Sequence, residues 1–352
     1  MPRVAAPPPL STVTAAELRV GWTASIDDYA VDLAWSPDGR ILAVGAVSGP
    51  VHLLDAETGQ SLARLEGHLR GTQQVAWNRT GTLLASAGQD GLARIWSRAG
   101  NRCEAELECG APWVERLAWS PLRDQLLTAA GRKLSLWDGA TGTLIRGYPD
   151  FGSTIYDLQW QPESAHFAVA GYGGIVMYRD DTPEATKRFD WKGSILRLAY
   201  SPDGNFIATG NQDASVHFWY RKSGKDLQMT GYMKKVRELS WDAGSRYLAT
   251  GGSPTVIVWD CSGKGPAGST PIQLDAHGQP VSALAYQNKG ALLASGCPQG
   301  LISVWSPKKS LRPVRQHRAQ SVVTWIGWAP GDDKLAMGSA DGSVTVFLPS
   351  AV

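Results

Sequence analysis

Residues 33–39 read LAWSPDG, and residues 198–204 read LAYSPDG. The two stretches differ only where Trp35 is replaced by Tyr200. Serine, a proline that fixes φ, aspartate and glycine in this order are typical of a reverse turn. Because a catalytic motif rarely occurs twice in one chain, we interpret each stretch as the end of one strand and the turn into the next.

The aromatic residue of this stretch, which we call the anchor, recurs along the whole chain. Successive anchors lie about 42 residues apart, and self-similarity at such a period indicates a repeat architecture. The anchors are Trp35, Trp77, Trp119, Trp160, Tyr200, Trp241, Tyr286 and Trp328. We therefore divide the chain into eight units, which begin near residues 30, 72, 114, 155, 195, 236, 281 and 323.

Two further segments follow each anchor. The first is short, apolar and rich in small residues, as in ILAVGA at 41–46 and LLASAG at 83–88. The second alternates apolar residues with others, and this period of two predicts a strand with one buried face. Each unit is expected to hold a first strand that ends at the anchor, a small-residue second strand, a third strand and a less regular fourth. The third strands end at Leu54, Trp96, Trp137, Tyr178, Trp219, Trp259, Trp305 and Phe347.

Short motifs inside these units resemble those of WD40 repeats. They include Gly67-His68, LLAS at 83–86, Asp90-Gly91 and the Trp-Asp pairs at 137–138 and 259–260. The resemblance extends from about residue 17 to residue 352, nearly the whole chain. It implies an all-β β-propeller built from four-stranded blades around a central channel.

The last unit has no residues left for a fourth strand. Residues 18–26, LRVGWTASI, alternate in the manner of a strand but have no unit in front of them. We predict that this strand completes the last blade and removes an exposed sheet edge. The expectation is thus eight blades, with seven, the commoner count in the resembled family, as the alternative. The propeller would be a single domain over 17–352, preceded by a disordered tail over 1–16.

The resemblance also implies a hydrogen-bonded tetrad within a blade, which the second unit carries in full as His68, Ser86, Asp90 and Trp96. A buried indole N–H needs an acceptor, and histidine can bridge a hydroxyl and a carboxylate. A hydrolase triad is the competing interpretation, but Ser86 lies in a predicted buried strand without a glycine elbow. A structural role is therefore expected. Other units keep parts of the set: Thr209, Asp213 and Trp219; His277, Ser295 and Trp305; His317 and Asp341.

Composition and motifs disfavour several classes of function. The formal net charge of +2 offers no global field for nucleic acid or a membrane surface. The sequence has no HExxH or CxxC motif, so neither a metal nor a cofactor is expected. The four cysteines suggest no disulfide framework, which favours a reduced, cytoplasmic protein. The carboxylates Asp32, Glu115, Asp157 and Glu238 fall at what we interpret as scattered repeat phases, so no catalytic centre is expected.

The predicted function is that of a non-catalytic scaffold, a monomer that binds a protein or peptide partner. The resembled family presents partners on the rim of the channel, and exposed Trp, Tyr and Arg dominate binding hot spots. Aromatic residues on this rim would either anchor a partner or plug the channel. The predicted partner-binding residues are Trp113, Tyr156, Tyr172, Tyr29, Lys235, Arg237 and Arg132.

Two alternatives stay open at this point. One is a propeller enzyme, a hydrolase or a quinone-dependent dehydrogenase. The other is an accessory protein of a metal-chaperone GTPase of the CobW class, because the insertion CSGKGPAGSTP at 261–271 resembles bacterial WD40 proteins of that association. The sequence fixes neither the partner nor a role for this insertion.

Overall fold

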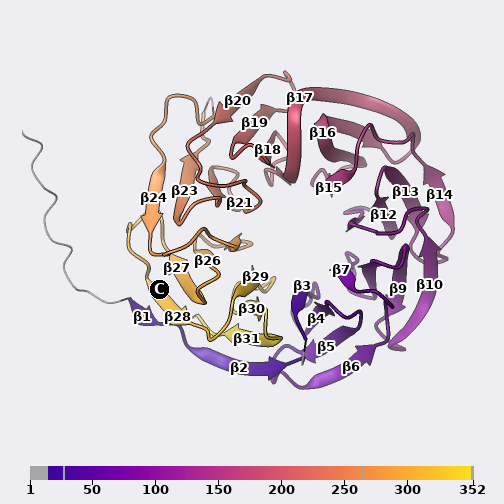
Figure 1. Ribbon diagram of the computed structural model, residues 1–352, viewed down its shortest axis with the longest axis horizontal. Helices are drawn as coiled ribbons and strands as arrows, with labels where there is room; N and C mark the ends of the chain where they lie inside the picture. Colours follow the sequence, from indigo (N-terminus) through magenta and orange to yellow (C-terminus); the bar gives the residue numbers. More distant parts are fainter. Residues whose placement is uncertain (1–14, 27, 264, 350–352) are drawn as a thin grey trace, which may run out of the picture.

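The computed structural model describes residues 15–26, 28–263 and 265–349. These residues form strands and turns, with no helix among them, and thus no helix that could cross a membrane. The strands are arranged around a central channel in a closed ring, which the chain follows once (Figure 1). The predicted all-β propeller is confirmed.

The first strand of every unit lies innermost. Each contacts the first strand of the next unit, and β29 contacts β3, so that the inner circle closes. Where the anchor is tryptophan, its indole N–H donates to a carbonyl of the preceding first strand, as from Trp77 to Ala34 and from Trp35 to Gly327, both at 3.1 Å. The inner strands are β3 (Ala30–Trp35), β7 (Thr72–Trp77), β11 (Arg116–Trp119), β15 (Ile155–Trp160), the last part of β17 (Thr182–Tyr200), β21 (Leu239–Trp241), β25 (Ala283–Tyr286) and β29 (Val323–Trp328).

Counted as continuous hydrogen-bonded sheets, the strands of the described residues form seven. In four of these sheets, the four strands follow in chain order from the channel outward. Their outer strands are β4 (Ile41–Ala46), β5 (Val51–Asp55) and β6 (Ser61–Leu65); β8 (Leu83–Gly88), β9 (Leu92–Ser97) and β10 (Arg102–Glu108); β12 (Gln125–Ala130), β13 (Lys133–Asp138) and β14 (Leu144–Gly147); β22 (Tyr247–Thr250), β23 (Thr255–Asp260) and β24 (Ile272–Asp275).

The fourth and fifth units share one six-stranded sheet of β15, β16 (His166–Arg179), β17, β18 (Phe206–Asn211), β19 (Val216–Tyr220) and β20 (Asp226–Met229). Gly173 and Gly174, with φ of 100° and 123°, let β16 turn without a separate loop. The early part of β17 pairs with β16, and its late part pairs with β18. The prediction of eight separate four-stranded blades is therefore wrong. The alternative count of seven holds for the sheets, which contain all eight sequence units.

The N-terminal segment joins the last two sheets. β1 (Ala16–Glu17) runs parallel to β28 (Arg315–Arg318), beside β27 (Leu301–Trp305) and β26 (Leu293–Gly296). The strand expected over 18–26 is β2 (Val20–Ser25), which pairs antiparallel with β31 (Ser343–Phe347), beside β30 (Leu335–Ser339). Between them, Leu18 is 1% exposed in a core cluster with Phe347. Most of the tail expected over 1–16 lies outside the described residues, but Ala16 belongs to β1 because its backbone pairs with Arg315.

The hydrophobic core lies between neighbouring sheets. In one cluster, Ala43 and Leu53 of the first unit pack against Trp77 and Trp96 of the second. The second strands need small residues because the next inner strand lies so close: a Cβ on Gly45 would meet Thr72 Cγ2 at 2.8 Å. The second strands are therefore rich in small apolar residues because this close contact between neighbouring units leaves no room for larger ones.

Candidate functional site

The tetrad of the second unit is closed to solvent. His68 Nε2 lies 2.8 Å from Ser86 Oγ, which also accepts from Trp96 Nε1 at 2.9 Å. His68 Nδ1 lies 2.9 Å from Asp90 Oδ1. Ser86 is 0% exposed and a Cβ on Gly88 would collide with the His68 ring, so no substrate reaches the hydroxyl. These hydrogen bonds connect the turn before β7 with strands β8 and β9.

Sequence analysis did not identify Arg94 as part of this network. Its Nη1 donates to Asp90 Oδ2 at 2.9 Å, and its Nε donates to Glu106 Oε1 at 2.8 Å. Burial alone would raise the pKa of Asp90, but the hydrogen bonds from Arg94 and His68 outweigh it and hold the pKa at about 2. The carboxylate is therefore ionised in the folded protein at neutral pH.

Other units satisfy the buried indole differently. In the seventh unit, Ser295 Oγ accepts from Trp305 at 2.8 Å and lies 2.7 Å from His277 Nε2. In the sixth unit, Tyr232 takes the histidine's place: its hydroxyl accepts from Trp259 Nε1 at 3.0 Å and pairs with Thr250 at 2.9 Å.

The fifth unit does not assemble the partial set expected from its sequence. Thr209 Oγ1 and Trp219 Nε1 are buried without a hydrogen-bond partner among the described residues. Asp213 instead accepts from Ser215 at 2.6 Å. The residue types match the repeat pattern, but no histidine stands at the position equivalent to His68, and the buried His217 pairs with Asp226 instead.

The predicted aromatic residues are exposed at the end of the ring where the inner strands begin. Trp113 is 54% exposed in the loop before β11, and Tyr156 in β15 is 39% exposed. Tyr172 in β16 is 60% exposed, and Tyr29 just before β3 is 41% exposed. Trp113, Tyr156 and Tyr172 belong to the neighbouring third and fourth units, and we call these three side chains the aromatic rim.

The predicted basic residues separate into two groups. Lys235 and Arg237 are exposed in the segment before β21. Arg132 is exposed in the turn between β12 and β13, where its Nε donates to the carbonyl of Phe151 at 2.8 Å. Of the predicted partner-binding residues, only Arg237 lines the cavity described next.

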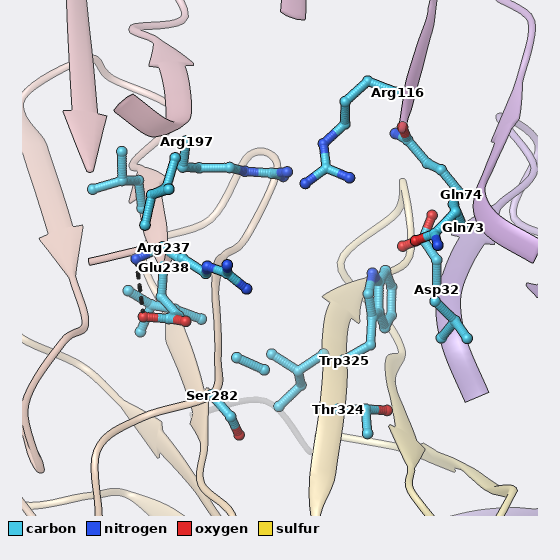
Figure 2. Close-up of a pocket in the computed structure, with 16 residues that line it drawn as sticks. Asp32, Gln73, Gln74, Arg116, Arg197, Arg237, Glu238, Ser282, Thr324 and Trp325 are labelled. Atoms are coloured by element: carbon cyan, nitrogen blue, oxygen red, sulfur yellow. Dashed lines mark hydrogen bonds between the residues drawn. The ribbon is translucent and has the colours of Figure 1, made fainter. Parts of the chain in front are cut away.

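A cavity of about 450 Å³ occupies the channel. Charged residues placed three before the anchor line it from several sides, and their guanidinium groups point into the open space (Figure 2). Asp32, Asp157 and Glu238 all occupy this phase, so our interpretation of scattered phases is wrong for them; Glu115 alone lies one position earlier. Counting all charged and amide residues by phase, and not carboxylates alone, would have found this ring. The residues three before the anchors are Asp32, Gln74, Arg116, Asp157, Arg197, Glu238, Ala283 and Trp325.

Several side chains of this ring accept a hydrogen bond from the backbone of the next inner strand. Asp32 Oδ2 accepts from the backbone N–H of Val75 at 3.0 Å, and Asp157 Oδ2 accepts from that of Leu198 at 2.8 Å. Gln74 Oε1 accepts in the same way from Leu117, also at 3.0 Å. These carboxylates therefore join neighbouring units and do not form a pair placed for acid–base catalysis.

The arginines of the ring gather around one carboxylate. Arg116 Nε lies 3.4 Å from Asp157 Oδ1, and Arg197 Nε lies 3.6 Å from Asp157 Oδ2. Burial raises the pKa of Asp32 to about 6, and burial also raises the pKa of Glu238. Within the described parts of the chain, no group of His, Cys, Asp and Glu is placed to hold a metal ion.

Comparison with known proteins agrees with this geometry. Residues 29–267 match the family described as "IFT122 first beta-propeller", and residues 268–306 match "WD domain, G-beta repeat". The chain belongs to the WD40-repeat β-propeller family.

Curated relatives are about a quarter identical to the chain over the aligned residues. THO complex subunit 3 of Arabidopsis thaliana is 26% identical over 68% of this chain and 64% of its own length. Anaphase-promoting complex subunit cdc20 of Dictyostelium discoideum is 25% identical over 61% of this chain and 53% of its own. The chain thus spans less than two thirds of either relative.

Among solved structures, the computationally designed Ika8 protein superimposes with a TM-score of 0.80 and 22% identity, covering 95% of this chain and all of its own. At this identity the likeness concerns the fold alone.

Proposed function

We propose that this WD40 propeller is a non-catalytic scaffold that binds a protein or peptide segment across the aromatic rim. The observation that carries the proposal is the exposure of Trp113, Tyr156 and Tyr172, at 54%, 39% and 60%, in two neighbouring units at one end of the channel. Large aromatic side chains contribute most to binding where they become buried at an interface.

The backbone under the rim is fixed by hydrogen bonds. The N–H of Tyr172 donates to Ser153 Oγ at 2.9 Å, and that hydroxyl lies 3.2 Å from the Tyr172 carbonyl. Beside Trp113, the N–H of Val114 donates to the Gly88 carbonyl at 2.9 Å. A fixed backbone lowers the entropy that binding would cost, which supports a role as a recognition surface.

Other observations support a scaffold. His68 and Ser86 are buried, and their hydrogen bonds together with Asp90 join strands. Two relatives carry names of complex subunits, THO complex subunit 3 and anaphase-promoting complex subunit cdc20. All four cysteines are free, which supports a reducing, cytoplasmic compartment.

The test begins with capture. The tagged full chain is used to isolate a partner, which mass spectrometry identifies, and titration calorimetry then measures its affinity for variants. Trp113→Ala or Tyr156→Ala should each weaken binding by about 2 kcal/mol. Arg40→Ala, in the turn after β3 at the opposite end of the ring, is the matched control and should leave the affinity unchanged.

Two results would contradict the proposal. Full affinity in both aromatic variants with a loss in Arg40→Ala would place binding on the other end of the ring. Turnover of a substrate by the chain without any partner would favour a propeller enzyme.

A further inference from the structure

The channel cavity brings three arginine side chains together. Arg116, Arg197 and Arg237 line it, and Figure 2 shows the guanidinium groups of Arg116 and Arg197 directed toward each other, with Arg237 beside them. The single carboxylate of Asp157 is shared between Arg116 and Arg197. Asp32 and Glu238 also line the cavity, so three arginines face three carboxylates, and an anion would be held by directed hydrogen bonds from the guanidinium groups and not by an excess of charge.

Two of these arginines have donor capacity to spare. Arg116 Nε is buried and has no hydrogen-bond partner of good geometry among the described residues. The Arg237 side chain donates no hydrogen bond to any residue that the structure describes; only its backbone N–H contacts Glu238, at 3.4 Å. A donor without a protein partner is available to an acceptor inside the cavity, and for the buried Arg116 Nε such a bond would also satisfy an unpaired polar group.

Part of the remaining lining, which also holds amide, hydroxyl and carboxyl groups, suits an acceptor on an aliphatic stem. Leu196, Ile326 and Trp325 supply apolar surface to the same cavity. The volume of about 450 Å³ is larger than a single small anion requires and lies in the range of cavities that hold organic groups. An inorganic anion would contact the arginines but leave the apolar wall unused.

We propose that this cavity binds an oxyanion, and that its occupant is a carboxylate side chain or chain end of the segment bound at the aromatic rim. The carboxylate accepts paired hydrogen bonds from Arg197 and Arg237, the geometry that guanidinium groups favour. This inference rests on the proposed function, because the segment reaches the cavity from the rim. Arg237 lies two residues from the exposed Lys235, which places the cavity next to the surface where partners are expected.

The experiment needs no natural partner. Calorimetry on the purified full chain measures binding of a hexaglutamate peptide with blocked ends, with hexaglutamine as the uncharged comparison. Arg237→Gln should weaken hexaglutamate binding about tenfold, because one charge-assisted contact contributes about 1.5 kcal/mol or more. Lys234→Gln removes the same charge from the same exposed segment outside the cavity and should change the affinity less than about twofold. Melting temperatures should differ little, since the Arg237 side chain donates no hydrogen bond to a described residue and its charge acts on Glu238 only from an exposed position.

Further arms separate the sources of the anion. Citrate and inorganic phosphate are titrated under the same conditions, and either one binding more tightly than hexaglutamate would overturn the assignment to a peptide carboxylate. Absence of hexaglutamate binding, or equal loss in Lys234→Gln, would overturn the site itself. If hexaglutamate binds through Arg237 but the chain captures no partner, the anion site would stand and the proposed function would be overturned. If Arg237→Gln still captures a partner and the parent chain does not bind hexaglutamate, only the anion site would be overturned.

Discussion

At the scale of single residues, the Asp32 carboxylate makes a stabilising hydrogen bond but also carries the cost of a buried charge. Its carboxylate holds the Val75 N–H at 3.0 Å, yet burial raises its pKa to about 6. An aspartate whose folded pKa lies above its unfolded value destabilises the protein once both states are ionised. That cost is fully present above pH 6 and disappears below about pH 4.

Asp32→Asn tests this cost. The asparagine oxygen can still accept from Val75, but it carries no charge to desolvate. We expect the variant to be more stable than the parent by about 1–2 kcal/mol at pH 7.5, with the difference vanishing near pH 4. Urea denaturation at several pH values measures it. A variant that is less stable than the parent at pH 7.5 but equally stable near pH 4 would show that the carboxylate's charge interactions with the arginines outweigh its burial.

His68 is the second residue-scale test. Removing its ring leaves Ser86 and Asp90 without their bridge, so His68→Ala should lower the free energy of unfolding by about 1–3 kcal/mol. His166→Ala is the control and should cost less than about 0.5 kcal/mol, because this histidine is partly exposed and its ring bonds only Ser164 among the described residues. Equal stabilities in urea would mean that the tetrad geometry contributes nothing to stability.

The tetrad's residue types could be predicted because they recur at fixed repeat positions. Arg94 and Tyr232 could not, because neither belongs to the pattern. Tyr232 substitutes for histidine by bringing a hydroxyl from the loop before β21 to Trp259, a solution visible only in three dimensions. Two arginines of the cavity, Arg116 and Arg197, lie at a fixed phase and Arg237 lies one position earlier in its unit, but none of them belongs to a recognisable motif.

At the scale of elements, period-two alternation located the strands well, and the anchors located the ends of the inner strands. The fusion of the fourth and fifth units could not be predicted in this way. Alternation does not reveal whether Gly173-Gly174 makes a loop or a tight turn inside a continuous strand. β1 was missed for a related reason, since a pair of residues carries no periodicity and gains its structure from β28.

The N-terminal segment offers a test at this scale. Removing residues 1–26 deletes β1 and β2, exposes β31 as a sheet edge and removes the buried Leu18. We expect aggregation or a large fall in melting temperature. Removing residues 1–14 deletes no described contact and should change the melting temperature little. Equal melting temperatures for the two truncations, measured by calorimetry, would show that β2 does not hold the ring closed.

At the scale of the whole molecule, the channel has a polar ring inside and an aromatic rim at one end, on a chain whose formal net charge is only +2. With so little net charge, no long-range field steers a partner toward the protein. Local charge at this end of the channel must therefore steer the partner. Lys235 is exposed there, in the same segment as Arg237. A flexible surface lysine contributes to encounter more than to the bound state.

Lys235→Gln is therefore expected to change kinetics and not the lifetime of the complex. With the captured partner on a sensor surface, the association rate should fall about two- to fivefold at 50 mM salt, and the difference should disappear at 500 mM because screening removes it. The dissociation rate should stay within about twofold of the parent at both salt concentrations. Trp113→Ala should show the opposite pattern, with faster dissociation and little change in association, because a buried aromatic anchor acts after encounter. A faster dissociation rate in Lys235→Gln would instead place the lysine inside the buried contact and extend the interface across the channel from the aromatic rim.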